Sequence, residues 1–381
     1  MPVGPVYRRG DRGPAVAEIR AKLATLGLLS EPPALRRPVE DALFDEACDR
    51  AVREFQQRRG LMVDGVVGSA TYRALDEARW QWGDRVLSYV GSRMLVGDDV
   101  AALQQRLLDL GFDCGRVDGI FGHQTVQAVR DFQRNVGIDA DGTCGPVTYA
   151  AFERLTRAVV GGQPYALRES ELIHRAGPAL AGKIVVLDPG HGARDPGLVG
   201  GRVAESSVVF DLAARLEGRL SATGVTAYLT RGPDTDLSED ERADLANTLH
   251  ANLLISLHVD AHPNPQASGV ATFYYANDSL GGSSPTGEKF AGLVQREIVA
   301  RTDLRDCRTH GKTWDLLRRT RMPAVRIDVG YVTNLDDARR LASPHFRDAV
   351  AEAIAVAVQR LYLPPDLDAP TGALRLPVLS G

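Results

Sequence analysis

The chain has 381 residues and a formal net charge of −4, and 44% of its residues are hydrophobic while 25% are charged. This length favours two or three domains, and this balance is typical of a globular protein rather than a disordered chain. The slightly acidic charge excludes the basic face of a general nucleic-acid binder, so we expect no nucleic-acid partner. No window approaches the roughly 18 apolar residues of a membrane span, so we expect no transmembrane segment.

The N-terminal stretch MPVGPVYRRGDRGPAVAEI contains no apolar run of the length that a signal peptide needs. We therefore expect a cytoplasmic protein, unless it is exported by a route that the sequence does not reveal. The four cysteines, Cys48, Cys114, Cys144 and Cys307, form no CxxC pair. We expect reduced, mostly buried thiols, and not a zinc ribbon or a thioredoxin-like motif.

An internal repeat occupies the N-terminal part of the chain. The segment FDEACDRAVREFQQRRGLMVDGVVGSATYRAL, from Phe44, matches FGHQTVQAVRDFQRNVGIDADGTCGPVTYAAF, from Phe121, at a constant offset of 77. Upstream the offset is 84, as for Leu23 and Leu107, because the first copy carries an insertion around SEPPALRRPVED. Each copy predicts three short helices: one that ends at a glycine, one that carries AVxxFQ, and one that follows a DGxxGxxT turn. Such a small unit favours a binding module over a catalyst.

The pattern LxxLG…DGxFGxxTxxAVxxFQxxxGLxxDGxxGxxT resembles the peptidoglycan-binding domain 1 family, over about residues 8–78 and 93–157. The second copy keeps VDGIFG at 117–122, whereas the first has ALFDEA in the equivalent loop. The resemblance therefore implies glycan binding by the second copy more than by the first. Its candidate residues are Asp118, Gly119, Phe121, Gly122, Asp141 and Gly142. The alternative is that both copies are only packing modules.

Residues 158–182 are interpreted as a linker with a short helix, and strands alternate with helices from residue 183 to 363. The expected strands are Lys183–Asp188, Val225–Thr230, Asn252–His258, Gly269–Tyr275 and Ala324–Gly330. The expected helices are Ser206–Thr223, Ser238–His250, Pro285–Thr302 and Pro344–Leu361. This alternation predicts an α/β domain with helices on both faces of the sheet. The tail, 364–381, is expected to be disordered, and Thr371 in it is a phosphorylation candidate that could dock the tail on a partner.

Candidate metal ligands follow the expected strands, where ligand sites of open α/β sheets gather. His191 comes just after KIVVLD, His258 ends LLISLH, and Glu205 begins a helix. Two histidines and one glutamate are a zinc set with one position open for water. Zinc lowers the pKa of that water, and a nearby carboxylate can move its proton to a leaving nitrogen, which indicates an amide hydrolase. Each residue alone is compatible with a purely structural role, but together they favour zinc.

The motifs DPGHG, LTR…D…LxxR…AN, SLHxxA and PAVxxxVGYxTN occur in the order of the amidase 3 type N-acetylmuramoyl-L-alanine amidases, over about residues 183–361. The resemblance implies a mixed sheet flanked by helices and one Zn²⁺ held by His191, Glu205 and His258. It also implies cleavage of the amide between N-acetylmuramic acid and L-alanine in peptidoglycan, muropeptides or their precursors. Arg231 and Asn247 belong to the intervening motif and are candidates for supporting the ligands. The repeats would then hold the enzyme on its substrate by effective concentration.

The chain departs from the family at the general base, where Asp328 replaces a glutamate. The missing methylene sets the carboxylate back by about 1.3 Å, and a misplacement near 1 Å costs roughly 100-fold in rate. Asp260 shares the strand face of His258 and could support it or replace the base, although we favour a solvated carboxylate.

Two repeats, an aspartate in the last motif and no signal peptide together resemble actinobacterial CwlM-type proteins. This resemblance implies a weakly active or inactive homologue that regulates peptidoglycan precursor synthesis in the cytoplasm, with cell-wall biosynthesis proteins as partners. The sequence thus leaves two main hypotheses, a zinc amidase and a cytoplasmic regulator. Glycan binding alone is a third.

Overall fold

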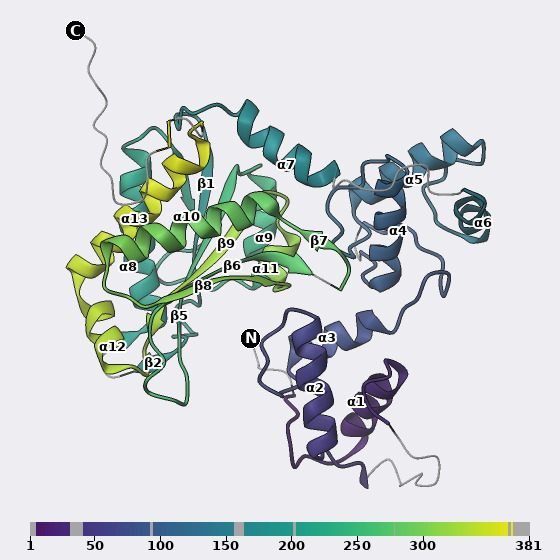
Figure 1. Cartoon of the computed structure of the whole chain (residues 1–381), viewed down its shortest axis with the longest axis horizontal. Coiled ribbons are helices and arrows are strands. Elements are labelled where there is room, and N and C mark those ends of the chain that lie inside the picture. The colour runs from purple at the N-terminus through teal and green to yellow at the C-terminus, as the bar shows by residue number, and fades with distance from the viewer. Residues whose placement is uncertain are drawn as a thin grey trace. The chain divides into compact units, whose positions relative to one another are not determined.

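The computed structural model describes residues 5–30, 41–91, 94–155, 164–200, 203–277, 279–364 and 367–368. The chain forms two compact units, Met1–Leu167 with Ala276–Ser283, and Arg168–Tyr275 with Ser284–Gly381 (Figure 1). The insertion in the first repeat at 31–40 and the candidate Thr371 lie outside the described residues. Within those residues no helix combines the length and the apolar character needed to cross a membrane.

The N-terminal unit contains two three-helix repeats, as the sequence predicts. The first has α1 (Pro14–Thr25), α2 (Glu46–Arg58) and α3 (Ser69–Ala78), and the second has α4 (Asp98–Asp109), α5 (His123–Val136) and α6 (Pro146–Arg154). Each repeat buries its own apolar core, centred on Phe44 and Phe55 in the first and on Phe121 and Phe132 in the second. Proline at the start of α1 and α6 suits a first helical turn, whose N–H groups lack partners within the helix.

The short helix that the sequence predicts between residues 158 and 182 is α7 (Pro164–Arg175). Its buried Glu169 accepts hydrogen bonds from the Ser284 hydroxyl at 2.7 Å and the Thr286 amide at 2.9 Å. These groups lie at the N-terminus of α10 (Pro285–Arg301), where a carboxylate is favourable. Helix α7 is therefore fixed to the α/β unit.

The second unit is built on a mixed sheet in the order β4-β1-β5-β9-β6, with β8 also paired to β6. All pairs in this order are parallel except β9 with β6, and β8 runs parallel to β6. The strands are β1 (Ile184–Pro189), β4 (Thr226–Leu229), β5 (Leu253–Asp260), β6 (Val270–Asn277), β8 (Asp306–Lys312) and β9 (Ala324–Tyr331). Short pairings add β2 (Val199–Gly200) with β3 (Val203–Ala204), and β7 (Gly282–Ser283) at the end of β6.

Helices cover both faces of the sheet, which confirms the predicted α/β architecture. Val185 and Leu187 of β1 pack in one core with α8 (Glu205–Ser221), α10 and α13 (Pro344–Tyr362). Val186 faces the opposite core, to which α9 (Glu239–Thr248) and α11 (Asp315–Arg319) contribute (Figure 1). The alternating side-chain direction along a strand produces these two cores.

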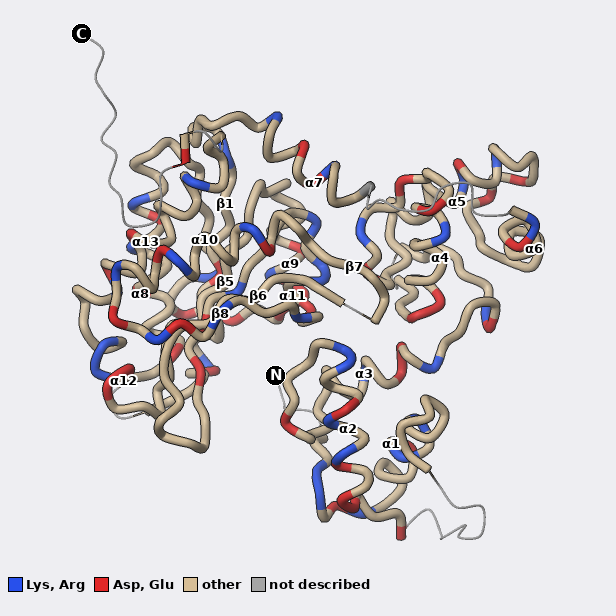
Figure 2. Tube along the Cα trace, viewed as in Figure 1, with Lys and Arg blue, Asp and Glu red and all other residues tan. Residues whose placement is uncertain are grey.

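Each predicted strand and helix of this domain has a counterpart, and Ser238 caps α9 in a capping box with Glu241. The sequence did not predict β8 or α12 (Leu335–Ala342). Strand β8 reads DCRTHGK and is half-exposed, so it lacks the apolar run by which a buried strand is recognised. Basic and acidic residues are interspersed along both units (Figure 2).

Candidate active site

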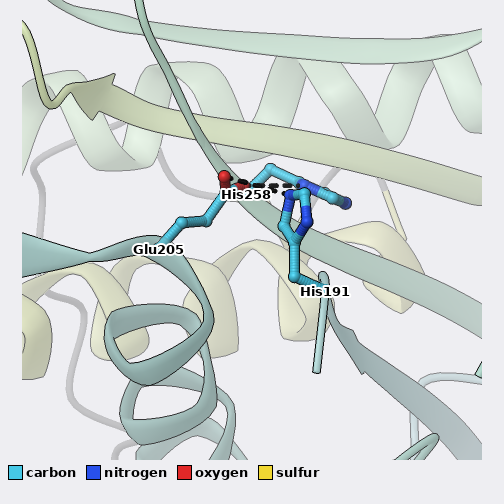
Figure 3. A group of neighbouring side chains, drawn as sticks. All are labelled: His191, Glu205 and His258. Atoms are coloured by element: carbon cyan, nitrogen blue, oxygen red, sulfur yellow. Dashed lines mark hydrogen bonds and ion pairs between the residues drawn. The ribbon is translucent and has the colours of Figure 1, made fainter. Parts of the chain in front are cut away.

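Three side chains that the sequence singles out meet at the carboxyl end of the parallel strands. His191 follows β1, Glu205 begins α8, and His258 lies in β5. The Glu205 carboxylate contacts both rings, with Oε2 3.0 Å from His191 Nε2 and Oε1 2.9 Å from His258 Nδ1 (Figure 3). One ligand atom from each residue lies within 4.8 Å of the others, so this group could hold a metal ion.

Glu205 is buried at the first turn of α8 and is fully hydrogen-bonded. Besides the histidines, it accepts bonds from the amides of Leu198 at 2.9 Å and Val259 at 3.1 Å. Burial opposes ionisation, but the hydrogen bonds from the histidines and these amides outweigh it and hold the pKa of Glu205 well below its usual range. The carboxylate is therefore ionised at neutral pH, as a metal ligand must be.

Two buried arginines hold the loop that carries His191, which adopts a positive φ of 61°. Arg231 donates to the carbonyl oxygen of Pro189 at 2.8 Å. Arg242 donates to the carbonyl oxygen of His191 at 2.6 Å and forms a 2.6 Å ion pair with the buried Asp188. Arg231 thus supports the loop through its backbone, which is consistent with its place in the motif.

Asp195 orients the ring of His191. Its Oδ2 lies 2.8 Å from Nδ1, which leaves Nε2 on the side of Glu205. Burial lowers the pKa of His191, but Glu205 and Asp195 outweigh it, so this pKa lies above the ordinary value. Asp195 was not predicted to belong to the site, although it lies four residues after His191 in the same loop.

The pKa of His258 is shifted in the opposite direction from that of His191. Burial and the positive charge of Arg326 lower its pKa below the ordinary value, which favours the neutral ring that binds metals. The loop before His191 passes close to this ring, because a Cβ added at Gly190 would lie 2.6 Å from both ring nitrogens. Only glycine permits that approach without a shift of the ring.

Asp328 lies beside the site, but it is already paired with an arginine. It lies on β9 directly beside His258 on β5, and only 4% of it is exposed. Arg326 donates from Nε to Oδ1 at 2.8 Å and from Nη2 to Oδ2 at 3.4 Å. The guanidinium also lies 4.6 Å from the centre of the Trp314 ring. The sequence analysis missed Arg326, yet residues two apart on a strand share a face.

A cavity of about 160 Å³ opens at this group. Its lining combines the two histidines with Asp195, Arg326 and an apolar wall from α11 and the residue before it, namely Trp314, Leu316 and Leu317. Asp328 does not line it. The cavity therefore presents the candidate metal ligands beside a guanidinium and an apolar surface, which suits a neutral amide with polar neighbours.

The other two candidate supporting residues bond elsewhere. The Asn247 amide donates to the Arg319 carbonyl at 2.9 Å and accepts from the Arg321 amide at 2.8 Å, so it holds the turn between α11 and β9. Asp260 is hydrogen-bonded to Tyr331, and burial raises its pKa above the ordinary value. Within the described part of the chain, neither residue is hydrogen-bonded to His191, Glu205 or His258.

The six candidate glycan-binding residues form the loops of the second repeat. Asp118 accepts bonds from the Gln104 side chain at 2.8 Å and the Ile120 amide at 2.9 Å, and Asp141 does the same with Gln133 at 2.8 Å and the Thr143 amide at 2.7 Å. Gly119 and Gly142 have positive φ and donate their amides to those two glutamines. Phe121 is fully buried, and Gly122 caps α5. Glycan contact by these residues stays a prediction.

The same glutamine–aspartate–threonine network occurs in the first repeat, where Gln56 joins Asp64 at 2.7 Å and Thr71 at 3.1 Å. In the second repeat, Gln133 similarly reaches Thr148 at 3.1 Å. The glutamine, aspartate, glycine and threonine that recur in both repeats thus form a hydrogen-bonded loop that packs beside the helices of its repeat.

Comparison with known proteins is informative for both units. The N-acetylmuramoyl-L-alanine amidase family model matches residues 185–360, and the peptidoglycan binding domain model matches 12–75 and 96–152. N-acetylmuramoyl-L-alanine amidase CwlM of Mycobacterium tuberculosis is 50% identical over 376 residues, which cover 97% of this chain and 92% of that protein. The chain belongs to the N-acetylmuramoyl-L-alanine amidase family. The three resemblances seen in the sequence, to peptidoglycan-binding domains, to amidase 3 type enzymes and to CwlM-type proteins, are thereby confirmed.

Other relatives cover the amidase part alone. The germination-specific N-acetylmuramoyl-L-alanine amidase of Bacillus subtilis is 33% identical over 200 residues, covering 48% of this chain and 81% of that protein. Among solved structures, N-acetylmuramoyl-L-alanine amidase AmiC2 of Nostoc punctiforme is 31% identical with a TM-score of 0.43, covering 47% of this chain and 96% of that one.

Proposed function

We propose that the α/β unit is a zinc-dependent amidase that cleaves the bond between N-acetylmuramic acid and L-alanine in peptidoglycan or its precursors. The convergence of His191, Glu205 and His258 carries this proposal. Two imidazoles and one carboxylate suit Zn²⁺ with a position left open. The carboxylate of Asp195 on His191 Nδ1 is the outer hydrogen bond that zinc-binding histidines use to fix their orientation.

Bound zinc would supply a Lewis acid that lowers the pKa of water and polarises a carbonyl group. The chain's own residues would prepare the site. Glu205 remains ionised, and Asp195 holds the His191 ring in one orientation. Trp314 and the leucines of α11 would give the amide an apolar surface on one side of the cavity. Asp328 is the proposed proton carrier to the leaving nitrogen, and Arg326 already donates a hydrogen bond to each of its oxygens.

The Arg326–Asp328 pair favours a second candidate function. Both carboxylate oxygens of Asp328 accept hydrogen bonds from Arg326. The candidate base is therefore one methylene shorter than the family's glutamate and is also held in place by an arginine. In this alternative the site binds muropeptides or precursors with little or no turnover. The protein then acts as a regulator of precursor synthesis in the cytoplasm.

Zinc content and cleavage of a soluble muramyl peptide, measured on the full chain, test the two functions. The wild type should retain one zinc ion per chain and release the stem peptide, as read by mass spectrometry. His191→Ala should lose both properties, whereas His174→Ala, an exposed histidine on α7, should keep both. Asp328→Glu should raise the rate if Asp328 is the base.

Each result has a clear meaning. A chain that binds no zinc overturns the metal proposal. A chain that binds zinc but releases no peptide, as wild type or as Asp328→Glu, overturns the amidase and supports the regulator.

A further inference from the structure

The two repeats differ at the groove between their first and third helices. In the first repeat, Lys22 of α1 pairs with Glu18 at 2.9 Å and with Asp76 of α3 at 3.3 Å. The Lys22 ammonium also lies 4.1 Å from the centre of the Tyr72 ring, and the Tyr72 hydroxyl donates to Glu18 at 2.6 Å. These polar contacts close α1 against α3.

The second repeat lacks this closure. At the offsets of 84 and 77, alanine (Ala102) takes the place of Glu18, arginine (Arg106) that of Lys22 and glutamate (Glu153) that of Asp76, while the tyrosine is kept as Tyr149. The Tyr149 hydroxyl instead donates to a backbone carbonyl of the segment before α4, at 2.7 Å. Glu153 is exposed and has no hydrogen-bond or ion-pair partner within the described part of the chain.

A tryptophan occupies the opened groove. The half-buried Trp82 ring meets Tyr149 edge-on at 4.7 Å and Phe152 at 5.6 Å, and the Arg106 guanidinium lies 4.1 Å from its centre. Two cavities of about 360 and 390 Å³ adjoin it, and both are lined by Trp82 and Glu153. We call this site the Trp82 groove, lined by Trp82, Asp84, Arg106, Asp109, Tyr149, Phe152 and Glu153.

The lining indicates the chemistry of the ligand. A sugar ring has an apolar C–H face and a polar edge of hydroxyl and N-acetyl groups. The aromatic side chains can bury that face, while Arg106, Asp109 and Glu153 can bond the polar edge. The groove carries charges of both signs, so a strongly charged ligand would meet repulsion on one side.

We propose that the Trp82 groove binds a chain of N-acetylated sugars and that the closed groove of the first repeat does not. This rests on the proposed function for the kind of ligand, and on the contrast between the repeats for its place. The binding surface is then the groove between α4 and α6, and not the loops that carry Asp118 and Asp141.

The test measures binding of the full chain to an N-acetylglucosamine hexamer by calorimetry. Trp82→Ala removes the aromatic wall. Ala102→Glu places a carboxylate four residues before Arg106, the spacing of the Glu18–Lys22 pair, and should close the groove. Both should weaken binding roughly ten-fold or more, since a buried tryptophan commonly carries much of the binding energy.

Ala21→Glu is the matched control, because it makes the same substitution at an exposed position of α1 in the first repeat. It should leave the affinity unchanged. Trp82 packs against the core of its repeat, so its replacement can also disturb folding, whereas Ala102→Glu changes a partly exposed position. Wild-type affinity in Ala102→Glu, or equal losses in Ala102→Glu and Ala21→Glu, would overturn the proposal.

Cleavage of a soluble muramyl peptide separates this proposal from the amidase. That substrate carries no glycan chain, so Ala102→Glu should cleave it at the wild-type rate. A wild-type chain that does not bind the hexamer overturns the Trp82 groove but leaves the amidase assay unaffected.

Discussion

Replacing Arg326 by methionine tests whether the buried Asp328 depends on this arginine. Among the described residues, Arg326 alone donates side-chain hydrogen bonds to Asp328. Removing one partner of a buried ion pair costs about 3–5 kcal/mol. The Arg326 side chain is 23% exposed, so water can reach the carboxylate that is left behind. We therefore expect the lower end, about 3 kcal/mol.

Hydrogen exchange at the amides of β5 and β9 measures this loss in the zinc-free chain, separately from the repeats. The double variant Arg326→Met/Asp328→Asn removes the unpaired charge and should recover most of the stability, as a double-mutant cycle reveals. If Arg326→Met is as stable as the wild type, or the double variant as unstable as Arg326→Met, the two residues are not coupled and the reasoning fails.

The same variant has a consequence for activity. If Asp328 is the general base, Arg326→Met releases it, and peptide release by the zinc-loaded chain should rise. The increase is bounded by the roughly 10²–10⁴-fold that a general base contributes. An unchanged or lower rate in a folded variant would show that Arg326 does not restrain the base.

Four further outcomes are expected. Gly190→Ala should lower zinc affinity roughly 10- to 100-fold by displacing His258, as equilibrium dialysis with metal analysis can show. Gln133→Ala should destabilise the second repeat by about 1–3 kcal/mol, measured by hydrogen exchange, because the buried Gly142 amide loses its acceptor and Asp141 loses a donor. Native alkylation should modify Cys307 before the three fully buried cysteines, as peptide mapping can show. Asp188→Asn should lower the free energy of unfolding by about 3–5 kcal/mol at neutral pH and by less in acid, as acid-unfolding curves can show.

The sign of the last prediction follows from the pKa of Asp188. Burial raises this pKa, but Arg242 and two hydroxyl groups outweigh it, so the folded value lies below the ordinary one. The stabilisation is therefore complete above the ordinary aspartate pKa and is lost as the pH falls through the lowered value. A cost for Asp188→Asn that stays constant down to low pH would contradict this assignment.

Matched controls exist for two of these variants. Gly218→Ala on α8 adds the same methyl group where no atom lies within 4 Å, and it should retain full zinc affinity. Gln57→Ala changes an exposed glutamine next to the buried Gln56 in the first repeat, and it should keep normal stability. A similar loss in a variant and its control would mean that the named contact is not responsible.

The sequence allowed much of the α/β unit to be predicted, because its central strands are apolar runs and its helices begin at recognisable caps. The convergence of His191, Glu205 and His258 was also predictable, since each follows or opens an element at the same edge of a parallel sheet. The thiols are free and mostly buried, as expected.

The environment of Asp328 was not predicted. The sequence shows a carboxylate in an apolar strand, but whether a buried charge faces a metal, water or an arginine depends on side-chain direction. Arg326 stands two residues before Asp328, so the strand periodicity alone places the two side chains on one face. Likewise, Asn247 belongs to a motif with Arg231, yet only Arg231 bonds to the loop that carries His191. The order of residues in a motif does not determine which hydrogen-bond partner each side chain has in the folded protein.

The hydrogen-bonded loops of the repeats have an evolutionary consequence. Each loop draws its glutamine from a helix of its own repeat and its aspartate, glycine and threonine from one short segment. Selection for folding alone can thus preserve these letters, even in a copy that has lost its ligand. Ala102, at a partly exposed position of α4, takes no part in these loops. If the Trp82 groove binds the glycan, the difference between the two copies locates the ligand better than the motif that both copies share.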